Sequence, residues 1–382
     1  MTESSLQADG PLGIEHFKEV VREHHPGHNV TAFETVRPKI RNGYTTYILS
    51  LEPPSTSFLT VSLPDAGTTP DPIASDSEAG SSAAPTPDAE PAPGIPPHTF
   101  ELIAHLSERI RTNTSMPVPD IALGTCANHR YMLTAPQPIR KPVPLSCASL
   151  DAKQRTLVDL KLGQAFAQLH QNVQNDWFGI PAETAPVAPS LPGLLSGSSV
   201  LASALSAAPS STAYSWQETF TGLLEDLLQH LPPAHAAAIP LADIRACLSR
   251  AIGFYLFDDA EVPALVTLTA SPDFIYVEEN ASGDGDLDVP IVIPPALALS
   301  HSVYGDPLLE GIFLPPGPGE AFMEGYKEAL IVFPRQRTKR MWYTLFFALL
   351  ALTAKRRDKQ DEEWALKMIE ETVEALKKAP SY

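Results

Sequence analysis

Two long proline-rich stretches limit which parts of this chain can contribute to a folded core. The chain has 39 prolines among 382 residues, roughly twice the usual ~5%, and they are unevenly distributed. Residues 65–97 contain eight prolines, six acidic residues and no lysine or arginine. Such a segment buries too little apolar surface to offset the entropy of ordering, so we predict a disordered insert there. Residues 182–214, rich in Ala, Ser and Pro, predict a second flexible insert.

The negative charge of the chain excludes two classes of partner. Lys and Arg number 27 against 45 Asp and Glu, which gives a formal net charge of −18. Nucleic acids and anionic membrane surfaces are bound through cationic side chains, so we expect neither as a partner. With 43% hydrophobic residues, the chain can still bury a core and form one large or two modest domains.

Cysteine usage and hydropathy predict a cytoplasmic protein. The three cysteines, Cys126, Cys147 and Cys247, form no C-x-x-C pair and no disulfide framework, which is typical of a reducing compartment. Residues 1–13 are polar and lack the apolar core of a signal peptide. The longest apolar run spans residues 341–352, is too short to cross a bilayer, and predicts a buried helix.

Apolar periodicity predicts helices in both halves of the chain. Leu102, Leu106 and Ile110 form one stripe at the helical spacing. Asp151 and Gln154 resemble a capping box at the start of another helix. We predict helices over residues 14–25, from 100 to before Pro117, over 151–170 and 216–230, and in the tail from 322 onward.

Short runs of β-branched and aromatic residues predict strands between these helices. We expect strands at residues 44–51, 58–63, 130–134, 265–268, 274–277 and 289–293. The first part of the chain then consists of strands and one helix, whereas the rest is mostly helical. This order is typical of an α+β protein with two lobes.

Three motifs follow one another along the chain. A Thr-Ser-Met-Pro-Val-Pro run follows the first lobe's helix, and an "LG…F…LH" helix and a "YGDPLLE" segment come after it. In their residues and their order these motifs resemble the aminoglycoside phosphotransferase-like family, the small-molecule branch of the protein-kinase fold, and most closely its divergent fungal branch, which has a Thr-Ser-Ile-Pro-Val-Pro run at the first of them. The matching segments are residues 111–120, 162–179, 304–310, 322–326 and 340–352.

The resemblance implies phosphoryl transfer from ATP in the cleft between two lobes. That reaction needs a basic residue on the third strand, a glutamate on the first lobe's helix that holds this base, and a catalytic aspartate. It also needs an asparagine and a second aspartate that hold Mg²⁺ at the phosphates.

The catalytic positions of this chain depart from the family pattern. Residues 265–277 match the apolar residues of the family's "LVHxDxxxxNIxV" segment. Threonine cannot serve as a general base near neutral pH, and neither phenylalanine nor alanine can ligate Mg²⁺. We therefore predict no catalytic residue, no metal site and no cofactor. The third-strand base falls on Ser62, the histidine, catalytic aspartate and asparagine fall on Thr267, Thr269 and Phe274, and the metal-binding aspartate falls on Ala298.

A few residues still match nucleotide-binding positions. Glu101 matches the acid of the first lobe's helix, but Ser62 offers it no basic partner. Asn42 and Gly43 stand where the family has a glycine-rich phosphate loop. Glu101, Asn42 and Gly43 are therefore the candidates for contact with a cofactor.

Two acidic groups offer alternative sites. Asp273 and Glu278 have the spacing of a rearranged catalytic pair, but a Pro-Asp turn is the simpler interpretation of Asp273. Residues 283–288 alternate carboxylates as a calcium loop does, yet lack its glycine and its final glutamate. We interpret them as a solvated hairpin turn.

Most of the remaining polar residues are expected to be structural. We predict that His170 is a buried, hydrogen-bonded residue and that the histidines at 24, 25 and 28 lie on a solvated helix end. His301 is a possible ligand contact beside the lost metal position. Asp306, which precedes a proline, is expected to cap the following helix. The basic residues at 335–340 and 355–357 are expected at solvated helix ends, with a phosphate-binding patch as the alternative.

We therefore expect an α+β, two-lobed protein-kinase-like (aminoglycoside phosphotransferase-like) fold. An N-lobe with a five-stranded sheet would span residues 1–135, a hinge 136–143 and a mainly helical C-lobe 144–382. The predicted function is that of a pseudokinase-type binding or scaffolding protein, with a small molecule or a protein bound in the interlobe cleft. The alternative is an active ATP-dependent phosphotransferase (kinase) that uses Mg²⁺ and acts on a small hydroxylated metabolite. The substrate, the partners and the oligomeric state stay open.

Overall fold

A computed structural model describes seven parts of the chain. These are residues 12–36, 44–62, 97–182, 214–278, 289–327, 333–353 and 359–380. The two predicted inserts, the Asn42-Gly43 pair, the acidic segment 283–288 and the basic residues 355–357 lie outside the described residues, save for a few residues at the ends of the inserts.

A five-stranded antiparallel sheet forms the first lobe. The strand order is β1-β2-β3-β5-β4. The sequence analysis predicted five strands in this sheet but not their order. The strands predicted near 44–51, 58–63 and 130–134 are confirmed as the three central strands, whereas the two edge strands were not predicted. The five strands are β1 (Asn29–Val36), β2 (Tyr44–Glu52), β3 (Ser55–Ser62), β4 (Ile121–Cys126) and β5 (His129–Thr134).

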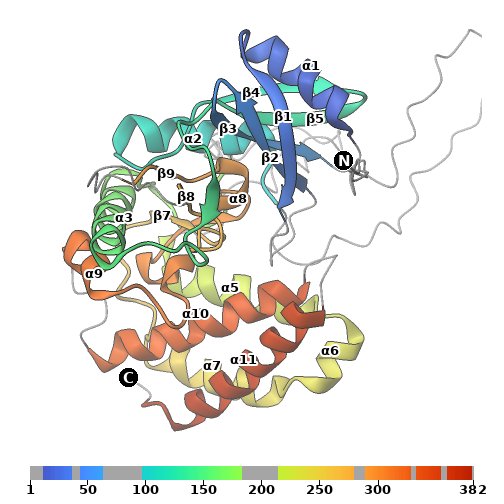
Figure 1. Ribbon diagram of the computed structural model, residues 1–382. Helices are drawn as coiled ribbons and strands as arrows, with labels where there is room; N and C mark the ends of the chain where they lie inside the picture. The colour runs from blue at the N-terminus through green and yellow to red at the C-terminus, as the bar shows by residue number, and fades with distance from the viewer. Residues whose placement is uncertain are drawn as a thin grey trace, which may run out of the picture.

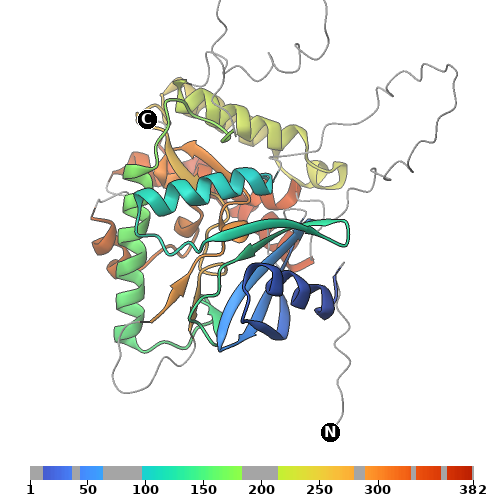
Figure 2. The same cartoon turned by 90° about the horizontal axis from the view of Figure 1, so that it is seen from above.

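Helix α1 (Ile14–His24) covers one face of this sheet (Figure 2). Its buried residues Phe17, Val20 and Val21 pack into a cluster with the side chains that β2 and β3 direct to that face, such as Tyr47 and Leu59. Because side chains alternate along a strand, the intervening residues point to the opposite face, toward the second lobe.

Helix α2 (Phe100–Asn113) joins the two lobes (Figure 1). The Thr99 hydroxyl accepts a hydrogen bond from the Leu102 amide at 3.2 Å and so caps its first turn. Ile103 and Leu106 are buried in the same cluster as Phe166 of the second lobe. The helix is therefore part of the core that the second lobe shares with the first.

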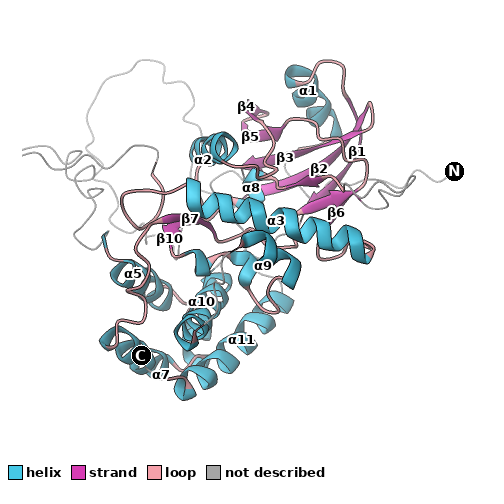
Figure 3. Ribbon diagram, turned by 90° about the vertical axis from the view of Figure 1, so that its left-hand side faces the viewer, coloured by secondary structure: helices cyan, strands magenta, loops and turns pink. Residues whose placement is uncertain are grey.

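The second lobe is mainly helical, with two small sheets (Figure 3). The predicted helices at 151–170 and 216–230 and the helical tail are confirmed. Among the described residues, none of the helices is both long and apolar enough to cross a membrane. Its helices are α3 (Ala152–Asn172), α5 (Trp216–Gln229), α6 (Pro233–Ala238), α7 (Leu241–Gly253), α8 (Pro295–Ala298), α9 (Glu320–Tyr326), α10 (Pro334–Thr353) and α11 (Lys359–Lys378).

The strands of the second lobe are short. Strands β6, β8 and β9 form one sheet, and β7 pairs with β10 in another. The predicted strand at 274–277 begins only at Tyr276, because residues 271–274 form a turn. The strands are β6 (Pro142–Pro144), β7 (Ala264–Thr267), β8 (Tyr276–Glu278), β9 (Ile291–Val292) and β10 (Ser302–Gly305), followed by the 3-10 turns η2 (Pro307–Leu309) and η3 (Gly311–Phe313).

Helices α3 and α9 approach each other so closely that glycine is required at their crossing. A Cβ atom on Gly163 would overlap the Phe322 carbonyl, and one on Gly325 would overlap the Leu160 carbonyl. The predicted capping box begins α3, since the Asp151 carboxylate accepts hydrogen bonds from the Lys153 and Gln154 amides at 2.8 and 2.9 Å.

A fully buried carboxylate, Glu310, connects the centre of the second lobe. It accepts hydrogen bonds from the amide and the hydroxyl of Thr267 on β7, the amide at 3.0 Å. It also lies 3.1 Å from Nε2 of His170 on α3, and Nδ1 of that ring lies 2.6 Å from the Tyr326 hydroxyl on α9. Three elements are thus held around one carboxylate, and His170 is buried and hydrogen-bonded as predicted.

The expectation of solvated ends for the basic residues of α10 is wrong at two positions. Lys339 is 2% exposed and forms ion pairs with Asp259, at 2.5 Å, and with Asp306. Arg340 is also buried, with its guanidinium on two backbone carbonyls. Asp306 caps η2 by accepting from the Leu308 amide at 2.9 Å, so its predicted capping role is confirmed, although a 3-10 turn rather than an α-helix follows.

The histidines after α1 are only partly solvated. His24 Nε2 lies 2.7 Å from the Tyr131 hydroxyl on β5, and His25 Nε2 lies 3.3 Å from the Thr134 carbonyl. The end of α1 is therefore fastened to the sheet that it covers.

Replacement of Glu310 should strongly destabilise the protein. Glu310→Ala leaves the Thr267 amide and hydroxyl without an acceptor in the core, and we expect a loss of roughly 3–5 kcal/mol in the free energy of unfolding. Urea denaturation followed by circular dichroism measures the change. The exposed Glu320→Ala, in the first turn of α9, is the matched control and should change stability by less than about 0.5 kcal/mol. A loss below about 1 kcal/mol for Glu310→Ala would contradict the central role of this carboxylate.

Candidate functional site

The structure brings together two of the positions that the family resemblance assigns to catalysis. Thr269 follows β7 and is buried, and its hydroxyl donates a hydrogen bond to the Ala298 carbonyl at 2.8 Å. The Ser300 hydroxyl oxygen lies 3.4 Å from the Thr269 hydroxyl oxygen. Positions 269 and 298 therefore lie side by side and are joined by a neutral hydrogen bond.

Thr267, at the position of the family's histidine, faces the interior. Its hydroxyl and amide are both directed to Glu310, and it is completely buried. This side chain therefore holds β7 in place and does not reach a cleft.

Phe274, at the position of the family's asparagine, belongs to an apolar cluster between the lobes. From the sheet come Ile48 of β2 and Phe58 of β3, whose ring centroid lies 5.0 Å from that of Tyr276 on β8. Each member is at most 8% exposed. We call this set the interlobe cluster: Ile48, Phe58, Ile139, Phe274, Tyr276, Val292 and Leu297.

The polar groups of the connection between the lobes are bonded within the chain. Thr56 of β3 exchanges two backbone hydrogen bonds with Gln137, of 3.0 and 2.8 Å. The Thr56 hydroxyl donates to the Ile139 carbonyl at 2.6 Å, and the Ile139 amide donates back to Gln137 at 2.7 Å. A molecule between the lobes would have to break these bonds to use the same groups.

Glu101 does have a cationic partner, although not on the third strand. It forms an ion pair with Arg130 of β5, in which both side chains are about half exposed. Ser62, at the end of β3, donates to the Arg130 carbonyl at 3.2 Å. The expectation that Glu101 lacks a partner is thus wrong, because the antiparallel neighbour of β3 supplies the charge.

Polar contacts also tie the N-lobe side of the molecule to the C-lobe. His98 is buried, and its Nε2 lies 2.9 Å from the Ser302 hydroxyl oxygen and 3.1 Å from the Ser302 amide nitrogen. Arg109 of α2 donates to the Tyr304 hydroxyl at 2.5 Å and to the Gln174 carbonyl at 2.9 Å. Burial of His98 lowers its pKa from 6.5 to about 4.

A cavity of about 430 Å³ is lined by Thr269 and by Phe274 of the interlobe cluster. Its polar lining includes Asp273, Asp361 and the ion pair between Arg155 and Asp159, in which Arg155 Nε lies 3.1 Å from the carboxylate. Its apolar lining is Leu145, Leu162, Leu268, Phe274, Ile312, Leu314, Phe322, Phe347 and Trp364.

Neither alternative acid assembles a metal site in the part of the chain that the structure describes. Asp273 lies in the 271–274 turn, as the sequence analysis preferred, while Glu278 lies at the end of β8, where it pairs with Pro142 of β6. His301 is buried, with its Nδ1 3.3 Å from the Ser300 hydroxyl oxygen. No group of three or more His, Cys, Asp or Glu side chains among the described residues could hold a metal ion.

Comparison with known proteins identifies the fold. No protein-family model matches the sequence, and no curated protein sequence matches it. Among solved structures, a candidate fructosamine-3-kinase from Haemophilus somnus matches with a TM-score of 0.52 at 13% identity, over 93% of this chain and 96% of that one. A second candidate fructosamine-3-kinase, from Thermobifida fusca, gives 0.51 at 16% identity, over 95% and 100%. The apo form of a thermostable mutant of aminoglycoside phosphotransferase APH(4)-Ia gives 0.51 at 12%, over 94% and 98%.

This chain has the aminoglycoside phosphotransferase-like fold. The predicted α+β, two-lobed kinase-like architecture is thereby confirmed. The sequence analysis aligned Thr267 and Thr269 with the family's catalytic positions, and in this fold both side chains are buried. It missed the interlobe cluster, because its members come from six separate segments that only the fold brings together.

Protonation of His98 should destabilise the protein in mild acid. A histidine with a pKa lowered to about 4 stays neutral in the folded state but takes up a proton near pH 6.5 when unfolded, so stability falls as pH drops below about 6.5. Between pH 7 and pH 5 we expect this residue to account for a loss of about 2 kcal/mol. Urea titrations of the wild type and of His98→Gln at both pH values give the free energy of unfolding, and the loss of stability between pH 7 and pH 5 should be smaller in His98→Gln. His105→Gln, at an exposed position of α2, should lose as much stability as the wild type. An equal loss in His98→Gln and the wild type would refute the assignment.

Proposed function

We propose that this protein is a pseudo-phosphotransferase, a non-catalytic binding or scaffolding protein on a kinase-like frame. The observation that carries the proposal is the interlobe cluster. In this fold the nucleotide is expected between the lobes, and here that space is bordered by Phe58, Phe274 and Tyr276 packed against one another.

The chemistry of the surrounding groups supports the same conclusion. Phosphoryl transfer requires a carboxylate at the attacking hydroxyl and oxygen ligands for Mg²⁺. The corresponding positions carry Thr269, whose hydroxyl is occupied by a backbone carbonyl, and Ala298. Glu101, the acid that would orient a phosphate-binding base, is paired with Arg130 on the surface.

The contacts between the lobes also argue against the opening that nucleotide entry requires. The His98 contacts with Ser302 and the Arg109 bond to Tyr304 cross from one lobe to the other, while the Thr56 bonds fix the sheet to the hinge. Together with the buried interlobe cluster, the two contacts that cross resist separation of the lobes, because both would be broken by it.

The 430 Å³ cavity beside Thr269 is the site that we propose for a bound ligand. A mutant of the same aminoglycoside phosphotransferase, solved as a ternary complex with ADP and hygromycin B, matches this chain with a TM-score of 0.51, so a fold of this kind holds a nucleotide and a second small molecule together. In the present chain we propose that the part of the fold that holds the second small molecule still binds a ligand, although the nucleotide is not bound. Three carboxylates against the single guanidinium of Arg155 favour a ligand with a cationic group and an apolar body.

The proposal predicts that the purified chain does not turn over ATP. With Mg²⁺ and a panel of sugars, aminoglycosides and amino alcohols, a coupled assay for ADP formation should give the rate of the heat-inactivated protein. Thr269→Ala and Asp273→Asn should leave this background unchanged, since neither residue has a catalytic role. Saturable, Mg²⁺-dependent ADP formation that either substitution abolishes would establish an active phosphotransferase instead.

A further inference from the structure

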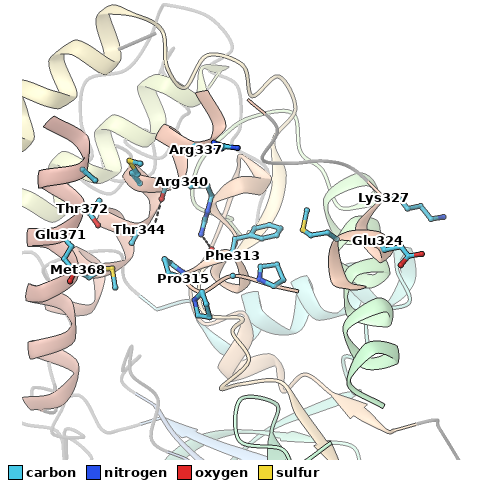
Figure 4. Close-up of a pocket in the computed structure, with 16 residues that line it drawn as sticks. Phe313, Pro315, Glu324, Lys327, Arg337, Arg340, Thr344, Met368, Glu371 and Thr372 are labelled. Atoms are coloured by element: carbon cyan, nitrogen blue, oxygen red, sulfur yellow. Dashed lines mark hydrogen bonds between the residues drawn. The ribbon is translucent and has the colours of Figure 1, made fainter. Parts of the chain in front are cut away.

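A second and larger cavity, of about 990 Å³, opens between the loop after η3 and the helices α9, α10 and α11 (Figure 4). We call it the α10 groove. The loop of residues 315–318 lines both this groove and the 430 Å³ cavity, so it forms the wall between them. The α10 groove is therefore separate from the site discussed above, and the inference drawn from it is independent of the proposed function.

A buried cation that forms no direct ion pair with a carboxylate of the described residues lies at the wall of this groove. Arg340 is 8% exposed; it donates from Nη1 to the Leu308 carbonyl at 2.5 Å and from Nη2 to the Phe313 carbonyl, and its guanidinium carbon lies 5.7 Å from the Phe313 ring centre. Among the described residues no carboxylate forms an ion pair with it. Burial lowers its pKa from 12.5 to about 10, and the more distant carboxylates of Asp306 and Glu310 offset only part of this shift.

Two of the five N–H groups of a guanidinium suffice for these two bonds. The remaining donors of Arg340 are left for a group in the groove, which its side chain lines. An anion there would add a negative charge in direct contact with the guanidinium and accept charge-assisted hydrogen bonds.

A second cation stands on the same face of α10. Arg337 precedes Arg340 by three residues, the spacing that places two side chains side by side on a helix, and both line the groove. Figure 4 shows both side chains on the same side of the cavity, while Glu324 and Lys327 point away from it. The other acid of the lining, Glu371, lies 3.9 Å from Lys367 on its own helix.

The rest of the groove is apolar and adaptable. Three of the chain's six methionines line it, Met323, Met341 and Met368. Unbranched thioether side chains adjust to ligands of variable shape. Phe313 and three prolines complete an apolar wall.

We propose that the α10 groove binds an amphipathic organic anion, a carboxylate with an aliphatic chain, whose head lies at Arg340 and Arg337 and whose chain lies along the methionines. Net charge complementarity favours this class, because the rest of the protein is strongly acidic and repels anions, whereas this groove offers two cations beside apolar surface. A neutral aliphatic molecule would leave Arg340 without an anion in direct contact, and a cationic one would add to its charge.

The test compares two probes of equal length that differ in charge. Calorimetric titration of the full chain with decanoate and with decanamide, both below their aggregation limits, measures the contribution of the anionic head. We expect saturable binding of one decanoate, with decanamide at least about tenfold weaker. No decanoate binding at millimolar concentration, or equal affinity for the two probes, would overturn the proposal.

Variants locate the site. Arg340→Gln would leave a neutral group in the core and can fail to fold, so the decisive variants are Arg337→Gln, expected to weaken decanoate about fivefold, and Met341→Trp, expected to block the groove and abolish binding. Lys378→Gln removes an exposed charge of α11 that does not line the groove and should bind decanoate as the wild type does. Equal losses in Lys378→Gln and Arg337→Gln, or unchanged binding in Met341→Trp, would place decanoate elsewhere and refute the assignment.

Discussion

The two lobes of this molecule meet through buried apolar side chains. Phe58 from the sheet packs on Tyr276 of the second lobe, and Phe274 and Ile139 close the contact from the loop and the hinge. The burial of such side chains stabilises by roughly 1.5–3 kcal/mol each, so separation of the lobes would be strongly unfavourable. This contact holds both lobes in one relative arrangement and so fixes the positions of the groups between them.

Behind this contact, the second lobe keeps the internal scaffold that would position a catalytic loop. Glu310 holds β7 through Thr267 and reaches α3 through His170, and α9 joins the same network through Tyr326. The loop after β7 is therefore well supported, yet it presents Thr269 to a backbone carbonyl. A fold of this kind can carry different functions on one frame.

How much of this could be predicted from the sequence depends on the separation of the interacting residues. Local signals were sufficient for α3, where the stripe of Val158, Leu162 and Phe166 is buried and the capping box of Asp151 forms. The central strands were predicted from their apolar residues, but the edge strands β1 and β4 were not, because they are half exposed and show no clear alternation. The charged residues of α10 were misinterpreted, since the buried Lys339 is paired with Asp259, which lies 80 residues away in the sequence.

The site shows the same division. Threonines at 267 and 269 follow from a simple match to the family's segment, and their burial agrees with the apolar residues around them. The partner of Glu101 was missed, because Arg130 lies 29 residues further on and reaches the helix only through the pairing of β5 with β3. The two cavities are likewise made of residues from many segments, and no local pattern marks them.

The central claim is that the interlobe cluster occupies the space in which this fold would hold a nucleotide. Calorimetric titration of the purified chain with ATP, with and without Mg²⁺, tests it most directly. We predict no binding that Mg²⁺ strengthens, because carboxylates are absent from the described positions that would hold the ion. Saturable binding of ATP that tightens markedly on addition of Mg²⁺ would mean that the cleft opens and assembles metal ligands, and it would contradict the account.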